Sequence, residues 1–355
     1  MKPSLLSSLL FSAAALALPL AAHAQITSVD LSQYVRVGRY DLPEPTRTAA
    51  PNAFNLLAQE ASAVTYNRDT GTLFIVGDGD TAIVQVSKTG ALVDSMTLAA
   101  GSSPQGTYFY DTEGLSYVGN GKFALVEERD RQVNLFTYAA NTTLGGAGVQ
   151  VAKLGTTVGN IGIEGISYDP QTGGFIAVKE KQPAGIFQTS INFATGTASN
   201  GSPTTVNATN LFDPAKLGLL DFADVFALSN VASLAGRPDS GNLLVLSQES
   251  GKLVETDRAG NVLSTLVIAS DAGNPLSIAD QQHEGVTMDD QGNLYLVNEN
   301  GGGDFDHPQL WVCAPRPLPL RFSPCSLQRH RRSSSSSPRS TRPAVLPAMR
   351  PTGSS

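Results

Sequence analysis

The sequence has few of the residues that build disulfide frameworks and zinc sites. Its 355 residues include only two cysteines and four histidines, so we expect neither a disulfide scaffold nor a His-rich zinc site. Only 15% of residues are charged, against 34 glycines, which argues against a coiled coil or a Lys/Glu-rich helical bundle. Beyond residue 24 no segment is apolar and long enough to span a bilayer. The length suffices for a large core in one or two domains.

The formal net charge of −7 conceals two blocks of opposite sign. Range 315–355 carries eight Arg and no acidic residue, and range 1–24 carries one Lys. The body, residues 25–314, therefore holds 15 basic and 31 acidic residues, a net charge of −16. Such a body repels phosphate backbones, so we expect no nucleic-acid partner. A divalent cation is the partner that this charge favours.

The N-terminus has the pattern of a secretory signal peptide. Lys2 precedes the apolar run Leu5–Leu20, and Ala22-His23-Ala24 supplies the small residues of a cleavage site. A membrane anchor is the alternative, although the apolar run is short for one. We therefore expect cleavage after Ala24 and a periplasmic or secreted protein, free or associated with a membrane but with no transmembrane segment of its own.

The C-terminal range 315–355 changes abruptly in composition, to eight Pro, eight Arg and ten Ser. Such a segment cannot build a core, so we expect it to be disordered. A basic arm for anionic surfaces and a frameshifted end are the two interpretations. A disulfide between Cys313, in the last expected strand, and Cys325, in the tail, stays open.

The body contains an internal repeat that predicts its architecture. Five short segments alternate in polarity as β-strands do, at spacings of 51, 51, 60 and 60 residues. They are Ser62–Tyr66, Glu113–Tyr117, Glu164–Tyr168, Asp224–Leu228 and Glu284–Met288. Each is followed by a Gly/Asp/Asn-rich turn and an apolar strand, at 73–76, 123–126, 175–178, 243–246 and 294–297.

Third strands such as 82–87, 132–138 and 252–257, and fourth strands such as 91–98 and 261–268, complete the units. Four strands in about 50 residues are typical of a β-propeller blade, so we predict an all-β chain folded as a single β-propeller. We count five blades, and a sixth stays open if range 190–222 contains irregular strands. The fifth unit ends after its third strand, at 309–312, and Tyr34–Leu42 can supply the fourth and close the ring.

The repeat also predicts where polar side chains gather. First strands start, and antiparallel second strands end, at the same face of a propeller near its axis. Eight carboxylates occupy these positions: Asp78, Glu113, Glu128, Glu164, Glu180, Asp224, Glu284 and Glu299. We expect them to line one mouth of the central channel, where their mutual repulsion requires protons or a counter-cation.

Oxygen ligands without His or Cys favour Ca²⁺, and Mg²⁺ less. Arg129, Lys179 and Lys181 lie beside the acidic column and are candidates to neutralise it or to bind an anionic group of a ligand. The alternative is that the carboxylates pair only with these bases and with loop N–H groups. His283, next to Glu284, is a candidate for a general base.

The blade motifs resemble those of the SdiA-regulated family of bacterial propeller proteins over about Glu60–Val312. The matching pieces are Asp111-Thr112-Glu113-Gly114, Ile163-Glu164-Gly165, Glu284-Gly285-Val286, Lys179-Glu180-Lys181-Gln182-Pro183 and Leu244-Val245-Leu246-Ser247-Gln248-Glu249-Ser250. Asp224-Val225 departs from the family's Ser-Gly in the fourth repeat. The resemblance implies a propeller of the cell envelope that binds a divalent metal, and it implies no reaction.

Three functions follow as hypotheses. The first is an envelope or secreted propeller whose acidic mouth binds Ca²⁺ and recognises a small molecule or an envelope protein. The second is a metal-dependent hydrolase, of the esterase, lactonase or phytase-like phosphoesterase class, in which a carboxylate activates water. The third is a structural scaffold with a filled channel. No nucleophile elbow, metalloprotease helix or phosphate-binding Gly loop occurs, so catalytic residues stay unassigned.

Overall fold

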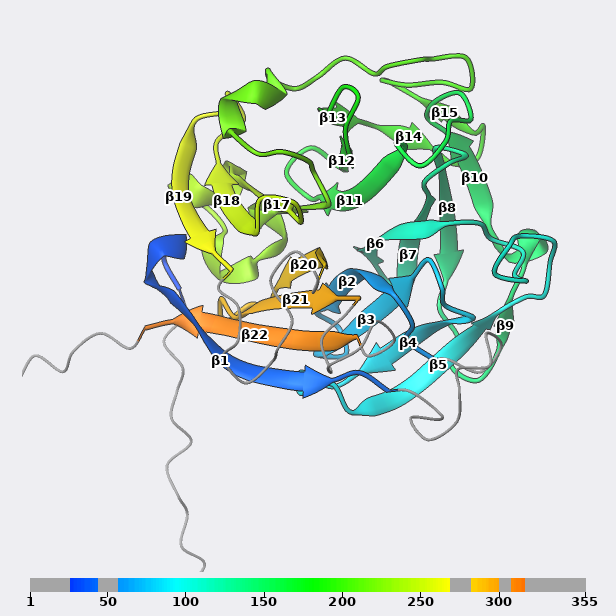
Figure 1. Ribbon diagram of the computed structural model, residues 1–355, viewed down its shortest axis with the longest axis horizontal. Helices are drawn as coiled ribbons and strands as arrows, with labels where there is room; N and C mark the ends of the chain where they lie inside the picture. The colour runs from blue at the N-terminus through cyan, green and yellow to red at the C-terminus, as the bar shows by residue number, and fades with distance from the viewer. Residues whose placement is uncertain (1–25, 44–56, 269–281, 300–307, 317–355) are drawn as a thin grey trace, which may run out of the picture. The chain divides into compact units, whose positions relative to one another are not determined.

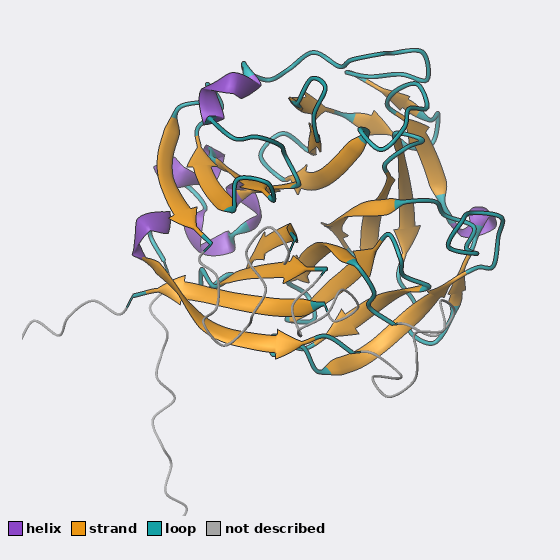
Figure 2. Cartoon of the chain, viewed as in Figure 1, coloured by secondary structure: helices purple, strands orange, loops and turns teal. Residues whose placement is uncertain are grey.

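The computed structural model describes residues 26–43, 57–268, 282–299 and 308–316. The expected signal peptide, Cys325 and the Arg/Ser/Pro-rich tail lie outside these ranges. Strands dominate the described residues (Figure 2), and their helices are short 3₁₀ turns. These turns are η1 (Leu31–Gln33), η2 (Gly146–Gly148), η3 (Pro214–Leu217), η4 (Leu228–Asn230), η5 (Ala232–Leu234) and η6 (Pro238–Gly241). In the described ranges no helix is long and apolar enough to cross a membrane.

Apart from one two-stranded hairpin, the described strands form five sheets, antiparallel except for one short added strand, which we number as blades in chain order (Figure 1). Blade 1 contains β2 (Ala61–Asn67), β3 (Thr72–Gly77), β4 (Ala82–Val86) and β5 (Leu92–Leu98). Blade 2 contains β6 (Thr112–Gly119), β7 (Lys122–Glu127), β8 (Gln132–Thr137) and β10 (Gln150–Lys153). Blade 3 contains β11 (Ile163–Asp169), β12 (Gly174–Lys179) and β13 (Gly185–Thr189). Blade 4 contains β16 (Asp224–Ala227), β17 (Leu243–Ser247), β18 (Lys252–Thr256) and β19 (Val262–Val267).

Blade 5 joins the two ends of the body. Its strands β20 (His283–Met288), β21 (Leu294–Asn298) and β22 (Gln309–Pro315) come from the last repeat. The fourth strand is β1 (Tyr34–Asp41), which pairs antiparallel with β22 from Tyr34 opposite Pro315 to Asp41 opposite Gln309 (Figure 1). This confirms the predicted closure, in which the N-terminal strand covers an edge that would otherwise stay unpaired.

The structure contains five blades, and range 190–222 does not form a sixth. That range holds a two-residue hairpin, β14 (Ile191–Asn192) with β15 (Thr197–Ala198), followed by turns and η3. Blade 3 has three strands rather than the four expected, because a Ser/Thr/Asn-rich stretch with Pro203 follows the hairpin and is rich in turns. Blade 1 gains a short strand, β9 (Thr143–Leu144), which pairs parallel with β5.

Five apolar clusters fill the spaces between successive blades. The second strand of a blade has apolar residues on both faces because it is packed between two such clusters. On β21, Leu294 and Leu296 face the cluster shared with blade 4, whereas Tyr295 and Val297 face blade 1. On β7, Phe123 and Leu125 face blade 1, whereas Ala124 and Val126 face blade 3. Burial on both faces explains why these strands are continuous apolar runs.

The innermost strands of neighbouring blades are tied by hydrogen bonds around the ring. The innermost strand of each blade is its first strand. In four of the five junctions, the fourth residue of the five-residue repeat segment has a side-chain hydroxyl, which accepts a hydrogen bond from a backbone N–H of the innermost strand of the next blade. The bonds are Tyr117 N to Thr65 Oγ1 (3.0 Å), Tyr168 N to Ser116 Oγ (2.7 Å), Ala227 N to Ser167 Oγ (3.0 Å) and Tyr66 N to Thr287 Oγ1 (3.1 Å). Blade 4 has Ala227 at this position, so another group must serve the fifth junction.

Candidate metal-binding mouth

A β-bulge at the start of the innermost strand positions the first ring of polar side chains. Pairing with the second strand skips one residue between Ala61 and Ala63, Thr112 and Gly114, Ile163 and Gly165, and His283 and Gly285. The skipped residues are Ser62, Glu113, Glu164 and Glu284. A bulged residue leaves the ladder and its side chain is re-aimed, here toward the axis of the propeller.

The glycine after each bulged glutamate is required by the neighbouring blade. A Cβ at Gly165 would lie 2.6 Å from the Cα of Asp224, and one at Gly285 would lie 2.8 Å from the backbone nitrogen of Val64. A Cβ at Gly114 would lie 2.9 Å from the carbonyl oxygen of Glu164. The Glu-Gly pair therefore combines a side chain aimed at the channel with close contact between innermost strands.

The residue before the innermost strand adopts a left-handed conformation in three blades. Glu60, Asp111 and Gln282 have φ angles of 50°, 59° and 50°. Each such non-glycine residue costs on the order of 1 kcal/mol, and such strain gathers at functional sites. In each of these three blades the bulged residue follows two positions later.

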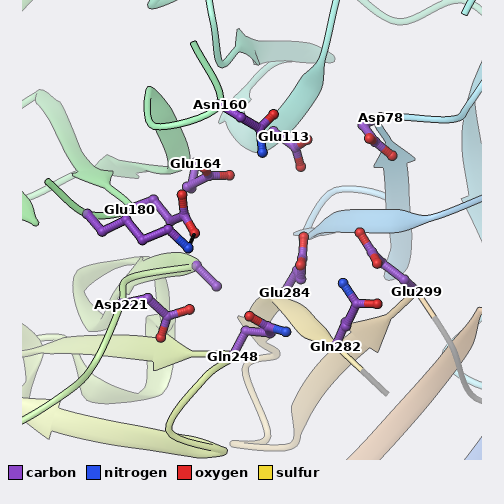
Figure 3. A pocket seen from close by; sticks show the side chains of 12 residues that line it. Asp78, Glu113, Asn160, Glu164, Glu180, Asp221, Gln248, Gln282, Glu284 and Glu299 are labelled. Atoms are coloured by element: carbon purple, nitrogen blue, oxygen red, sulfur yellow. Dashed lines mark ion pairs between the residues drawn. The ribbon is translucent and has the colours of Figure 1, made fainter. Parts of the chain in front are cut away.

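A cavity of about 250 Å³ lies where the first strands of the blades begin and the second strands end. We call it the acidic mouth and define it by its lining: Asp78, Glu113, Asn160, Glu164, Glu180, Lys181, Asp221, Ala223, Gln248, Gln282, Glu284 and Glu299. Figure 3 shows that the labelled carboxylates from different blades point into one shared space. Seven carboxylates and three amides supply oxygen there, and no His or Cys is among the lining residues.

Six of the eight predicted carboxylates line the acidic mouth: Asp78, Glu113, Glu164, Glu180, Glu284 and Glu299. Glu128 lies behind this ring, with a carboxylate oxygen within 4.8 Å of oxygens of Glu164 and Glu180. Its side chain is 1% exposed. Seven of the predicted positions are thus brought together.

Asp224 is the exception, and its placement corrects the expectation that all eight line the mouth. Its strand has no bulge, since Asp224 pairs in register with Leu246. Its carboxylate is buried and accepts from the backbone N–H groups of Val225 (2.7 Å) and Val286 (2.8 Å). Val286 belongs to the innermost strand of blade 5, so Asp224 makes the fifth junction of the ring, which Ala227 cannot make.

The repeat did not reveal two carboxylates that the structure adds. Asp221 lies three residues before β16, lines the mouth, and accepts from the hydroxyl of Ser247 and the backbone of Glu249. Asp111 precedes Glu113 in Asp-Thr-Glu-Gly and lies within 4.8 Å of Asp78 and Glu113. Asp111 was visible as part of that motif, whereas no pattern marked Asp221.

Among the described residues, the carboxylates form three groups of three in which oxygens lie within 4.8 Å of one another: Asp78–Asp111–Glu113, Glu128–Glu164–Glu180 and Glu180–Asp221–Glu249. The second group has buried oxygens that meet no hydrogen-bond donor. Glu128 Oε1 accepts from the backbone N–H of Gly162 at 2.6 Å, whereas its Oε2 has no partner. Glu180 Oε2 is also unpartnered, and its Oε1 is 2.5 Å from Lys181 Nζ. Buried oxygens of this kind suit a cation.

The three predicted cations occupy different surroundings. Lys181 lines the mouth and pairs with Glu180 and, at 3.1 Å, with Glu249. Arg129 forms an ion pair with Asp111 and a hydrogen bond to Asn160, so it braces the rim without lining the cavity. Lys179 is buried outside the mouth, where its ammonium donates to the backbone carbonyls of Lys181 and Pro183.

Burial raises the pKa values of the mouth carboxyls, and their mutual repulsion adds to the effect. The pKa of Asp78 rises to about 7 and those of Glu128 and Glu299 to about 8. The pKa values of Glu113, Glu164 and Glu284 lie well above their usual range. When no cation is bound, burial and repulsion therefore favour the protonated forms of these groups.

His283 does not line the mouth. It is 2% exposed, its ring meets that of Trp311 at 4.4 Å in an edge-on contact, and neither ring nitrogen has a hydrogen-bond partner. Burial and the nearby Arg36 lower its pKa to about 3, so the ring is neutral. A general base needs access to substrate, which this position does not provide.

Solved structures similar to this chain include three proteins, each at low identity. A luciferin-regenerating enzyme shares 9% identity with a TM-score of 0.43, covering 79% of this chain and 94% of its own. A Myxococcus xanthus glutaminyl cyclase shares 10% with a TM-score of 0.42, covering 79% and 95%. Virginiamycin B lyase from Staphylococcus aureus shares 11% with a TM-score of 0.36, covering 77% and 83%.

The sequence comparison is more specific than these structural similarities. Residues 46–301 match the SdiA-regulated family. This range includes the bulged Glu-Gly pairs and every lining residue of the acidic mouth. The chain belongs to the SdiA-regulated family.

Proposed function

We propose that this protein is a periplasmic or secreted calcium-binding propeller whose acidic mouth recognises a small molecule or an envelope protein. The observation that carries the proposal is the group formed by Glu128, Glu164 and Glu180. Three carboxylates from two blades converge there, and two of their buried oxygens meet no donor. A cation would provide the missing partner and offset the repulsion.

The donor set favours calcium over other divalent cations. The mouth offers carboxylate and amide oxygens only, which excludes the N and S ligands that zinc and copper prefer. Ca²⁺ accepts six to eight oxygens in irregular geometry, whereas Mg²⁺ requires a near-octahedral shell and keeps several waters. Many carboxylates around a cavity of about 250 Å³ fit the first requirement better.

The rest of the cavity supports a role in recognition. Amides of Asn160, Gln248 and Gln282 line it beside Lys181, so a small polar ligand would find donors as well as the cation. A ligand with a carboxylate or vicinal hydroxyls can bind Ca²⁺ directly and use these side chains for orientation. A protein partner would instead insert an acidic or amide side chain.

Thermal unfolding of the purified protein tests metal binding. The protein is first treated with EDTA and then measured with millimolar Ca²⁺ or Mg²⁺ at equal ionic strength. We expect a rise of several degrees with Ca²⁺ and a smaller one with Mg²⁺, because only the folded state binds the cation. Equal melting temperatures with EDTA, Ca²⁺ and Mg²⁺ would refute the proposal.

A metal-dependent hydrolase is the second candidate. The pKa values of about 7 at Asp78 and about 8 at Glu299, both of which line the mouth, favour it, because general acid–base groups work best near the operating pH. With Ca²⁺ bound, the cation would supply Lewis-acid chemistry, a mouth carboxylate would accept the proton of water, and Lys181 would hold an anionic group. Calcium-dependent release of phosphate from inositol phosphates, or of acid from esters and lactones, would establish this function.

A further inference from the structure

A second cavity has a lining distinct from that of the acidic mouth and carries the opposite charge, although the charge of Lys179 interacts with those of Glu128, Glu164 and Glu180. A cavity of about 30 Å³ is lined by Arg131, Lys179, Pro183, Ala184, Gly185, Phe187, Asn207, Ala208 and Asn210. Two of these residues carry positive charge, and no carboxylate is among them. The side chains of Arg131 and Lys179 are 0% and 5% exposed.

The guanidinium of Arg131 is held on one edge and unpartnered on the other. Its Nη1 donates to the carbonyl oxygens of Val206 at 2.5 Å and Thr205 at 3.4 Å. Its Nε and Nη2 are buried and have no hydrogen-bond partner. These two groups form the edge of a guanidinium that donates two parallel N–H bonds to an anion.

The guanidinium packs closely against a neighbouring loop. Arg131 has a φ angle of 49°, in the left-handed region, at the turn between β7 and β8. A Cβ at Gly155 would lie 2.3 Å from the Cζ of Arg131, so the guanidinium packs directly on that glycine. The Arg131 side chain is therefore a fixed part of the protein interior.

The charge of Arg131 lacks a counter-ion among the described residues. Burial alone lowers the pKa of Arg131, with no contribution from a carboxylate. Lys179 does not compensate, because its ammonium donates to two backbone carbonyls and has the same sign as Arg131. A buried, unpaired charge is strongly unfavourable, so an arrangement of this kind calls for an anion.

We propose that the cavity between Arg131 and Lys179 binds a small monovalent anion of the chloride or formate class, as a structural site separate from the acidic mouth. The volume of the cavity limits the size of the anion. One water molecule needs roughly 10–15 Å³ of cavity, and this cavity offers about 30 Å³. A halide or formate fits this space, whereas a sugar acid or a nucleotide does not. The anion would accept from Nε and Nη2 of Arg131.

The test compares anions that fit with one that does not. Thermal unfolding of the full chain is measured in EDTA at fixed pH and ionic strength, with sodium chloride, sodium formate or sodium gluconate. We expect melting temperatures several degrees higher in chloride or formate than in gluconate, which is too large for the cavity. Equal values in all three salts would overturn the proposal, and EDTA makes the result independent of calcium.

Variants and a halide soak locate the effect. Arg131→Met should lose the difference between chloride and gluconate, whereas Arg68→Gln, which removes an exposed positive charge, should keep it. Persistence of the difference in Arg131→Met would place the anion elsewhere and overturn the proposal. If that variant does not fold, bromide-soaked crystals of the unaltered protein decide: an anomalous peak at the Arg131 edge supports the site, and water there refutes it.

Discussion

Replacing Glu164 by Gln separates a metal ligand from a structural carboxyl. Glu164 occupies a bulge at the start of β11, and its oxygens lie within 4.8 Å of those of Glu128 and Glu180. Its pKa is well above the usual range because of burial and the charges of Glu113, Glu128 and Glu284. The metal-free protein therefore favours the protonated, neutral form of this side chain, and Gln reproduces the shape and charge of that form.

The expected magnitudes follow from the free energy that cation binding adds to the folded state. A cation at 100 times its Kd stabilises the unaltered protein by about 2.7 kcal/mol. For a domain of this size, roughly 2 °C of melting temperature corresponds to 1 kcal/mol, so the rise is about 5 °C. Glu164→Gln should reduce this rise to below about 1 °C while changing the metal-free melting temperature little, or raising it slightly as repulsion is relieved.

The assay is thermal unfolding of both proteins in EDTA and in a Ca²⁺ titration. Asp130→Asn is the matched control, because its side chain is 40% exposed and pairs with Lys153 outside the mouth. This variant should keep the full calcium response. An undiminished response in Glu164→Gln would show that Glu164 is not a ligand, and a collapse of the metal-free fold would show that it is a structural partner.

Three further predictions follow from the fold and the mouth. The mouth carboxyls have higher pKa values in the folded protein than in the unfolded chain, about 8 at Glu128 and Glu299. The stability of the metal-free protein should therefore fall as the pH rises from about 5 to 8, as melting curves at different pH values would show. Saturating Ca²⁺ should weaken or reverse this trend. Gly165→Ala should destabilise the protein by about 1–3 kcal/mol in urea titrations, because its Cβ overlaps the innermost strand of blade 4, whereas Gly159→Ala, with nothing within 4 Å, should be neutral. Asp224→Ala should lower the free energy of unfolding by about 1–3 kcal/mol, because the N–H of Val286 loses its acceptor. Its calcium-induced rise in melting temperature should match that of the unaltered protein. A smaller rise would show that Asp224 contributes to the metal site.

The blades and their closure were predictable because the information that specifies them is local. Alternating polarity and Gly/Asn/Asp turns indicate strands and hairpins within a few residues, and repetition at 51 and 60 residues indicates that these hairpins recur as blades. The missing fourth strand of the last repeat and the alternation of Tyr34–Leu42 sufficed to predict the pairing of β1 with β22. The three-stranded blade 3 was not predictable, because range 190–222 contains short strands within irregular turns.

The acidic mouth was predictable as far as the repeat applied. Six of eight predicted carboxylates line it because equivalent positions of equivalent blades face the axis. Asp224 shows the limit: its sequence position matches the repeat, but β16 has no bulge, and its carboxylate serves the junction that Ala227 leaves open. In this junction the carboxylate of Asp224 takes the role that a hydroxyl has in the other four. That role can be seen only in the folded ring, where the innermost strand of blade 5 lies beside Asp224.

The sequence alone determined the all-β repeat and the column of acidic residues, since these depend on periodicity within each unit, and it left five or six blades open. Only the tertiary structure decided which carboxylates meet, which glycine contacts which strand, and that Arg131 and Lys179 share a cavity without a carboxylate. Those contacts join different blades or loops far apart in the chain. Their energies depend on burial and on the distance between charges, and neither quantity exists until the ring has closed.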